Sequence, residues 1–137
     1  MQLTPVIAIH LTAALGALVI GPVALWARKG ATQRPRLHRA FGYAWVTLML
    51  ATALSALFIR DFKLPNLAGY TPIHLLIPAV LFGLFGAFWF LACKNIAGHR
   101  KAMQSLYFSA CIGAGSFTLL PGRYLGQLVW HDWLALV

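Results

Sequence analysis

Four histidines lie in the opening turns of four apolar runs of this sequence: His10, His38, His74 and His99. A histidine inside a membrane-type apolar segment is costly and needs a partner. Neutral imidazole is a good axial ligand of haem iron, and two imidazoles that face each other across a helical bundle can occupy both axial positions. The four residues therefore predict haem binding, provided that the helices bring them together in pairs.

Apolar runs that could cross a bilayer make up most of the chain. Of its 137 residues, 61% are hydrophobic and only 9% are charged, far less charge than a soluble domain carries. The runs cover about residues 4–27, 37–59, 72–93 and 100–120, each near the roughly 20 residues that a helical span requires. We therefore expect an all-α integral membrane protein, a four-transmembrane-helix antiparallel bundle forming one domain over residues 1–137. The short connections leave no room for a nucleotide-binding or protease domain.

The charged residues predict how this bundle is oriented. The chain has 11 Lys and Arg against 2 Asp and Glu, a net charge of +9. Eight basic residues and no acid belong to the first and third connections: Arg28, Lys29, Arg34, Arg36, Arg39, Lys94, Arg100 and Lys101. The positive-inside rule places these connections in the cytoplasm and both termini outside. A net positive charge of this size would suggest nucleic-acid binding in a soluble protein. Here the orientation of the bundle in the membrane explains it, and we expect no nucleic-acid partner. The expected location is the inner membrane of a bacterium.

The first apolar run and the C-terminal tail are expected to differ in how they meet the membrane. The first apolar run has its positive charges after it, the wrong order for a cleaved signal peptide, so it is expected to remain as a helix. The tail, residues 124–137, is too short to cross the membrane. Trp130 and Trp133 predict that it lies in the interface, with His131 at its surface.

Alternating helix direction sorts the four histidines into two levels. His10 and His74 would share the outer level, and His38 and His99 the inner level, each pair coming from diagonal members of a four-helix ring. The levels would be roughly 24 Å apart at 1.5 Å per residue, which suits electron transfer between a haem in each leaflet. If only one haem b is bound, the outer pair is favoured, because it lies farther from the basic connections.

Small and basic residues complete the expected haem sites. Gly21, Gly42 and Gly113 would leave room for the macrocycle, and the propionates could pair with Arg39, Arg100 and Arg123. Each feature has a simpler explanation, since histidines near helix ends can bind headgroups and small residues allow tight helix packing. The joint pattern of one histidine per helix on two matched levels favours haem. Cys93 and Cys111 fit no metal-site spacing and are expected to be small buried residues.

Two resemblances bear on function. The sequence resembles an uncharacterised bacterial family of predicted membrane proteins, a domain-of-unknown-function family, through LHRAFGYAW (37–45), ATALSALFI (51–59), PIHLL (72–76), GHRKAMQSLY (98–107) and TLLPGRYLG (118–126). Its helix and histidine pattern is similar to the core of the transmembrane ascorbate-reducible b-type cytochromes, which have six helices. This similarity implies that His10 and His74 hold one haem and His38 and His99 the other.

Three functions remain open on the sequence alone. The first is a small b-type cytochrome that transfers electrons across the bilayer from a cytoplasmic donor or a quinol to an outer acceptor, as a haem-dependent oxidoreductase or electron carrier. The second is a non-catalytic accessory or assembly subunit of a larger membrane complex, or a homodimer. Its histidines would then be structural or would chaperone a metal. The third is a small transporter with proton-relaying histidines, which the scarcity of acidic residues disfavours.

Overall fold

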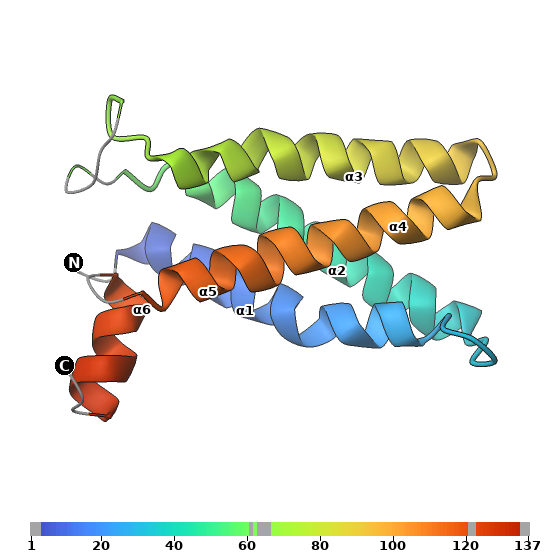
Figure 1. Cartoon of the computed structure of the whole chain (residues 1–137), viewed down its shortest axis with the longest axis horizontal. Coiled ribbons are helices and arrows are strands. Elements are labelled where there is room, and N and C mark those ends of the chain that lie inside the picture. Colours follow the sequence, from blue (N-terminus) through green and yellow to red (C-terminus); the bar gives the residue numbers. More distant parts are fainter. Residues whose placement is uncertain (1–3, 61, 63–66, 121–122, 135–137) are drawn as a thin grey trace.

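The computed structural model describes residues 4–60, 62, 67–120 and 123–134 of the chain. Four helical rods run side by side through most of this part (Figure 1). The first two are α1 (Pro5–Trp26) and α2 (Pro35–Ala56); the third joins η1 (Pro72–Leu75) to α3 (Leu76–Ala92). The fourth joins α4 (Ile96–Leu106), η2 (Tyr107–Gly113) and α5 (Ala114–Thr118), and the short α6 (Tyr124–Gly126) and η3 (Gln127–Trp133) then lie across one end of the bundle. The expectation of an all-α protein is confirmed for the described residues, which form no β-strand.

Local sequence signals explain where these rods begin. The Thr4 side chain accepts a hydrogen bond from the Ile7 amide at 3.3 Å, and Pro5 occupies the first turn of α1. The Asn95 side chain caps α4 by accepting from the Gly98 amide at 2.8 Å. The second rod begins at Pro35 rather than near 37 and ends at Ala56 rather than near 59.

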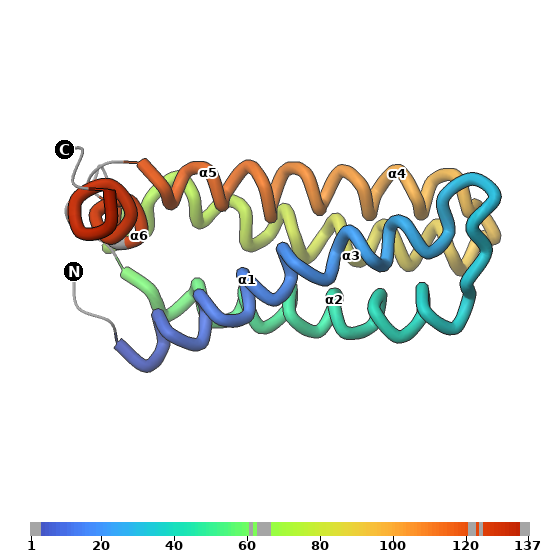
Figure 2. The backbone as a smooth tube through the Cα atoms, turned by 90° about the horizontal axis from the view of Figure 1, so that it is seen from below, coloured from blue at the N-terminus to red at the C-terminus, as the bar shows by residue number. Residues whose placement is uncertain are grey.

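The four rods form a ring in chain order. Contacts join α1 to α2, α2 to α3, α3 to α4, and η2 back to α1, so the first and third rods are diagonal, as are the second and fourth (Figure 2). The core between them consists of small residues and a few large ones: Ala17, Trp45, Met49, Ala53, Ile77, Val80, Leu84, Leu106 and Tyr107. Large apolar side chains such as Phe82, which is 76% exposed, cover the outside of the rods.

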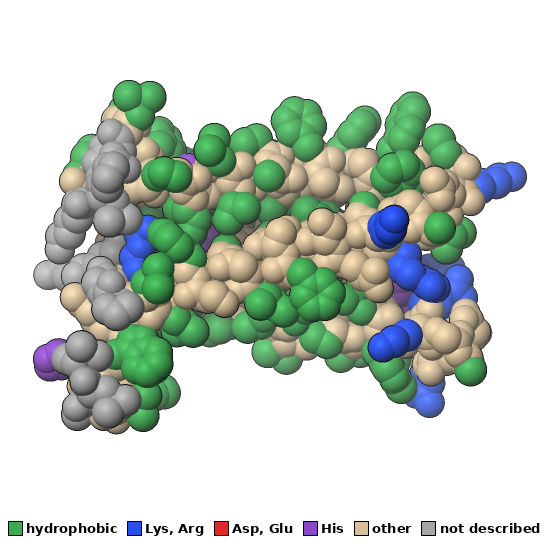
Figure 3. All heavy atoms as spheres, in the orientation of Figure 1, with side chains coloured by type: hydrophobic (Ala, Val, Ile, Leu, Met, Phe, Trp, Pro, Cys, Tyr) green, Lys and Arg blue, Asp and Glu red, His purple; other side chains and the backbone are tan. Residues whose placement is uncertain are grey.

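Length and apolar character mark two of the rods as candidate membrane spans. Pro5–Trp26 and Pro72–Ala92 are each long and apolar enough to cross a bilayer. Lys and Arg side chains gather at the end of the bundle that holds the α1–α2 and α3–α4 connections, while apolar side chains follow the rods (Figure 3). Cys93, expected to be buried, is exposed, because it is the residue at which α3 ends.

Candidate functional site

The two histidines at the basic end of the bundle make the same contact in two different hairpins. His38, in the first turn of α2, places its Nδ1 2.8 Å from the carbonyl oxygen of Ala24 on α1. His99, in the first turn of α4, places its Nδ1 2.9 Å from the carbonyl oxygen of Ala87 on α3. A carbonyl only accepts hydrogen bonds, so Nδ1 must donate in both. The neutral ring then carries its free lone pair on Nε2.

This hydrogen bond is the one that metal-bound histidines usually make. A ligating imidazole almost always donates its other N–H to a carbonyl, carboxylate or water, which fixes the tautomer and the ring orientation. Among the described residues, neither the Nε2 of His38 nor that of His99 has a hydrogen-bond partner. Both side chains are half-buried, and both belong to diagonal members of the ring.

At the opposite end of the bundle, His10 also donates from Nδ1 to a carbonyl oxygen of another helix. Its Nδ1 lies 3.0 Å from the carbonyl oxygen of Thr52 and 3.1 Å from the Ser55 hydroxyl, both on α2. The lone pair again falls on Nε2, which no described residue contacts by a hydrogen bond.

His74 differs from the other three histidines because both of its ring nitrogens are engaged. The Thr71 amide donates to Nδ1 at 3.1 Å, and Nε2 lies 2.8 Å from the carbonyl oxygen of Ile59, to which it must donate. The ring therefore joins the start of η1 to the end of the second rod. Tyr70 packs edge-on against it, with ring centroids 5.1 Å apart. In this arrangement His74 has no free nitrogen lone pair for a metal.

The three candidate glycines have different surroundings. A Cβ at Gly21 would lie 2.6 Å from Tyr107 and 3.0 Å from the Trp45 Nε1, so aromatic side chains already fill that space. A Cβ at Gly42 would meet no atom within 4 Å, and one at Gly113 would meet only the Phe108 carbonyl, at 3.5 Å. Gly42, one turn from His38, is therefore an open position beside an inner histidine.

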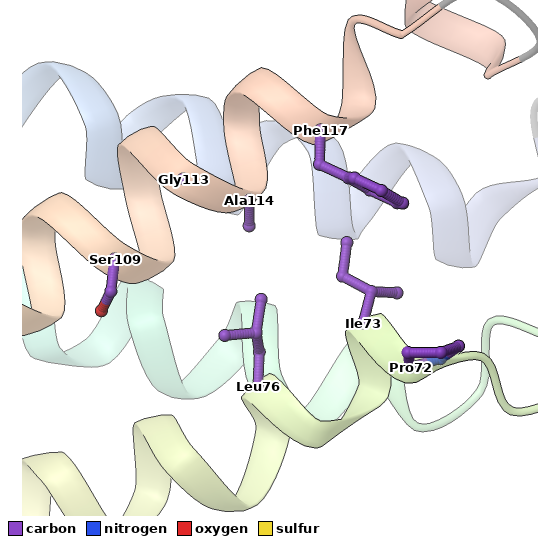
Figure 4. Close-up of a pocket in the computed structure, with 7 residues that line it drawn as sticks. All are labelled: Pro72, Ile73, Leu76, Ser109, Gly113, Ala114 and Phe117. Carbon is purple, nitrogen blue, oxygen red and sulfur yellow. The ribbon is translucent and has the colours of Figure 1, made fainter.

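A cavity of about 290 Å³ lies beside Gly113, between the third and fourth rods. Pro72, Ile73, Leu76, Ser109, Gly113, Ala114 and Phe117 line it, and Figure 4 shows Phe117 and Ile73 pointing toward each other across it. Its volume is at the lower limit of ordinary ligand sites. It opens at the level of His74 rather than at that of His38 and His99.

The three candidate arginines lie in different places. Arg39 is exposed one residue after His38. Arg100 follows His99 and donates through Nη2 to the carbonyl oxygen of Arg28 at 3.1 Å, which joins the two basic connections. Arg123 is half-buried at the other end, its guanidinium carbon 4.8 Å from the centroid of the Phe117 ring.

Sequence reasoning did not single out Trp45 or Gly86. The Trp45 indole N–H is buried and has no hydrogen-bond partner in the described part of the chain. Gly86 precedes Ala87, the partner of His99, and a Cβ there would meet nothing within 4 Å. A tryptophan in an apolar run resembles any other core residue, so only the packing could identify it.

The helices, their apolar exterior and the basic end are together typical of a helical membrane protein. The chain belongs to the family described as "Predicted membrane protein (DUF2306)", whose model matches residues 7–130. No curated protein and no solved structure matches the chain.

Proposed function

We propose that the protein is a small b-type cytochrome of the bacterial inner membrane, with haem b held between His38 and His99. The observation that carries this proposal is the pair of Nδ1 hydrogen bonds to Ala24 and Ala87, which leave the Nε2 lone pairs of two diagonal histidines without a partner. Two neutral imidazoles with free Nε2 atoms are the donor set of a six-coordinate haem iron.

The surroundings of this pair fit a bound macrocycle. Gly42 and Gly86 are both partly buried and have open space where a Cβ would stand, one on each of the neighbouring rods α2 and α3. Arg39 and Arg100 follow directly after the two histidines and supply positive charge for the propionates. When bound, the haem would supply one-electron chemistry, while the chain supplies ligands, orientation and a low-dielectric shell.

The outer pair supports a second haem less well. His10 offers a free Nε2, but His74 uses both nitrogens to join Thr71 and Ile59. A haem there would require the 2.8 Å bond to the Ile59 carbonyl to break. The proposal is therefore one haem at the inner level, the reverse of the preference that the distance from the basic connections suggested.

The proposal includes four membrane crossings with both termini outside. All four rods run along the length of the bundle, tilted relative to one another, and the basic connections lie at one end of it. The positive-inside rule makes this the cytoplasmic end, which puts His38 and His99 near a cytoplasmic electron donor or a quinol. The lipid bilayer covers the apolar exterior.

Spectroscopy of the purified full chain tests the haem. Protein from haem-replete cells, in detergent, is expected to show a b-type reduced-minus-oxidised difference at about one haem per chain. His38→Ala and His99→Ala should each remove it. His131→Ala is the matched control, since His131 is exposed in the tail. His74→Ala should keep the haem, which separates the inner site from the outer one.

Two results would overturn the proposal. A colourless natural chain from haem-replete cells would exclude a resident haem and leave an accessory or assembly subunit as the better account. Loss of haem on His74→Ala, with retention on His99→Ala, would instead move the site to the outer level.

A further inference from the structure

A pair of sulfur atoms lies in the bundle core, apart from the histidines. The Cys111 Sγ, in η2, is 3.6 Å from the Met49 Sδ, on α2. These two rods are diagonal in the ring, so the sulfurs meet across its interior. Met49 is buried in the core cluster, and Cys111 packs against that cluster. Cys111 also lies in a π-helical turn, a local geometry that is frequent at functional sites.

An unsatisfied donor lies in the same part of the core. Trp45 is only 4% exposed, and its Nε1 has no hydrogen-bond partner in the described part of the chain. Trp45 precedes Met49 by one turn of α2, so both side chains lie on the buried side of that helix. A buried N–H without an acceptor is costly, and a thiolate beside Met49 would supply the missing acceptor.

We propose that Cys111 and Met49 bind one Cu(I) ion, with the Trp45 N–H donating to the Cys111 thiolate. On binding, the Cys111 S–H loses its proton to solvent and a copper–sulfur bond forms, while the Met49 thioether adds a second bond. With metal–sulfur bonds of about 2.3 Å, as for zinc, the two sulfurs would be about 3.8 Å apart at a tetrahedral angle and about 4.6 Å apart in the near-linear arrangement that two-coordinate Cu(I) prefers. The sulfurs are 3.6 Å apart, so they would have to separate on binding.

The surroundings of the sulfur pair select this ion. Thiolate and thioether ligands favour Cu(I) over harder cations. No group of three or more His, Cys, Asp or Glu residues in the described part of the chain could hold a metal, so the site lacks the ligands of a zinc or calcium centre. Charge balance also favours Cu(I), because one thiolate and one monovalent cation have no net charge together. A divalent ion would leave a net charge in the apolar interior, where charge is costly.

Titration of the purified chain with Cu(I), against a colorimetric Cu(I) chelator under anaerobic conditions, tests the site. The expected stoichiometry is one Cu(I) per chain. Cys111→Ser should abolish this binding, whereas Cys93→Ser, which changes the exposed cysteine, should keep it. Trp45→Phe, which removes a donor to the ligand, should weaken binding about 10- to 100-fold. Met49→Leu, nearly equal in volume, should weaken it at least as much.

A measurement on the natural chain guards against variants that fail to fold. Bound Cu(I) should protect Cys111 from a membrane-permeant maleimide while Cys93 stays reactive, as peptide mass spectrometry would show. Cu(I) binding that survives both Cys111→Ser and Met49→Leu would overturn the proposal, as would equal labelling of Cys111 with and without copper. His38→Ala and His99→Ala should leave Cu(I) binding unchanged, so this proposal can fail or succeed separately from the haem.

Discussion

His74 differs from His10, His38 and His99 in which ring nitrogen donates. It donates through Nε2, whereas the other three donate through Nδ1. The positions of the apolar runs were enough to predict that each histidine lies near a helix start. The choice of free nitrogen was not predictable, because it depends on which carbonyl of a neighbouring segment faces the ring. For His38 and His99 that carbonyl lies 14 and 12 residues earlier in the chain, a register set by tertiary packing.

The core around Gly21 is packed so tightly that it has no room for a larger side chain. A Cβ there would meet the Tyr107 ring at 2.6 Å, and that ring is anchored by a 3.0 Å hydrogen bond from its hydroxyl to the Leu18 carbonyl. Gly21→Ala is therefore expected to destabilise the protein by about 1–3 kcal/mol through overpacking. Thermal unfolding in detergent would measure this loss.

Gly42→Ala is the matched control for Gly21→Ala, because both glycines lie inside helices but only Gly42 has open space. In haem-free protein it should be neutral or stabilising by roughly 0.5–1 kcal/mol, since alanine loses less backbone freedom on folding. Equal melting temperatures for the two variants would contradict the packing around Gly21.

At the scale of the helices, the apolar runs predicted an all-α protein, but they could not predict breaks in regular geometry. The third rod begins with the 3-10 turn η1, where His74 bonds to the Thr71 amide, and the fourth contains the π-helical η2. Thr71 and Pro72 mark a helix start without indicating that its first turn is 3-10, and the apolar run of the fourth rod carries no signal for a π-helical segment. The sulfur pair and the Trp45 donor depend on how the second and fourth rods pack, which explains why the cysteines had predicted no site.

The hairpin of α3 and α4 depends on a three-residue connection, Cys93 to Asn95. Lys94 takes a positive φ of 57°, and the Asn95 side chain then caps α4 through the Gly98 amide. Asn95→Ala removes this acceptor and should cost about 1 kcal/mol of stability, seen as a lower melting temperature. Asn95→Asp retains the acceptor and adds a favourable negative charge at the helix start, so it should preserve stability. A melting temperature that falls equally in both variants would show that Asn95 does not stabilise the helix through this acceptor.

For the whole molecule, the clustering of basic side chains at one end predicts the orientation in the membrane. The third rod, Pro72–Ala92, is long and apolar enough to cross the bilayer once, so residues on either side of it should face opposite compartments. Leu67 is 84% exposed before this rod, and Cys93 is exposed directly after it. The positive-inside rule puts Leu67 outside and Cys93 in the cytoplasm.

Labelling of spheroplasts with a membrane-impermeant maleimide checks this orientation. Leu67→Cys, made in a Cys93→Ser chain, should react in intact spheroplasts. Cys93 of the natural chain should react only after the membrane is permeabilised, and the Cys93→Ser chain shows the background from Cys111. Labelling of Cys93 in intact spheroplasts would invert the bundle and place His38 and His99 on the outer side. Reaction of both positions from the same side would show that the third rod does not cross the membrane.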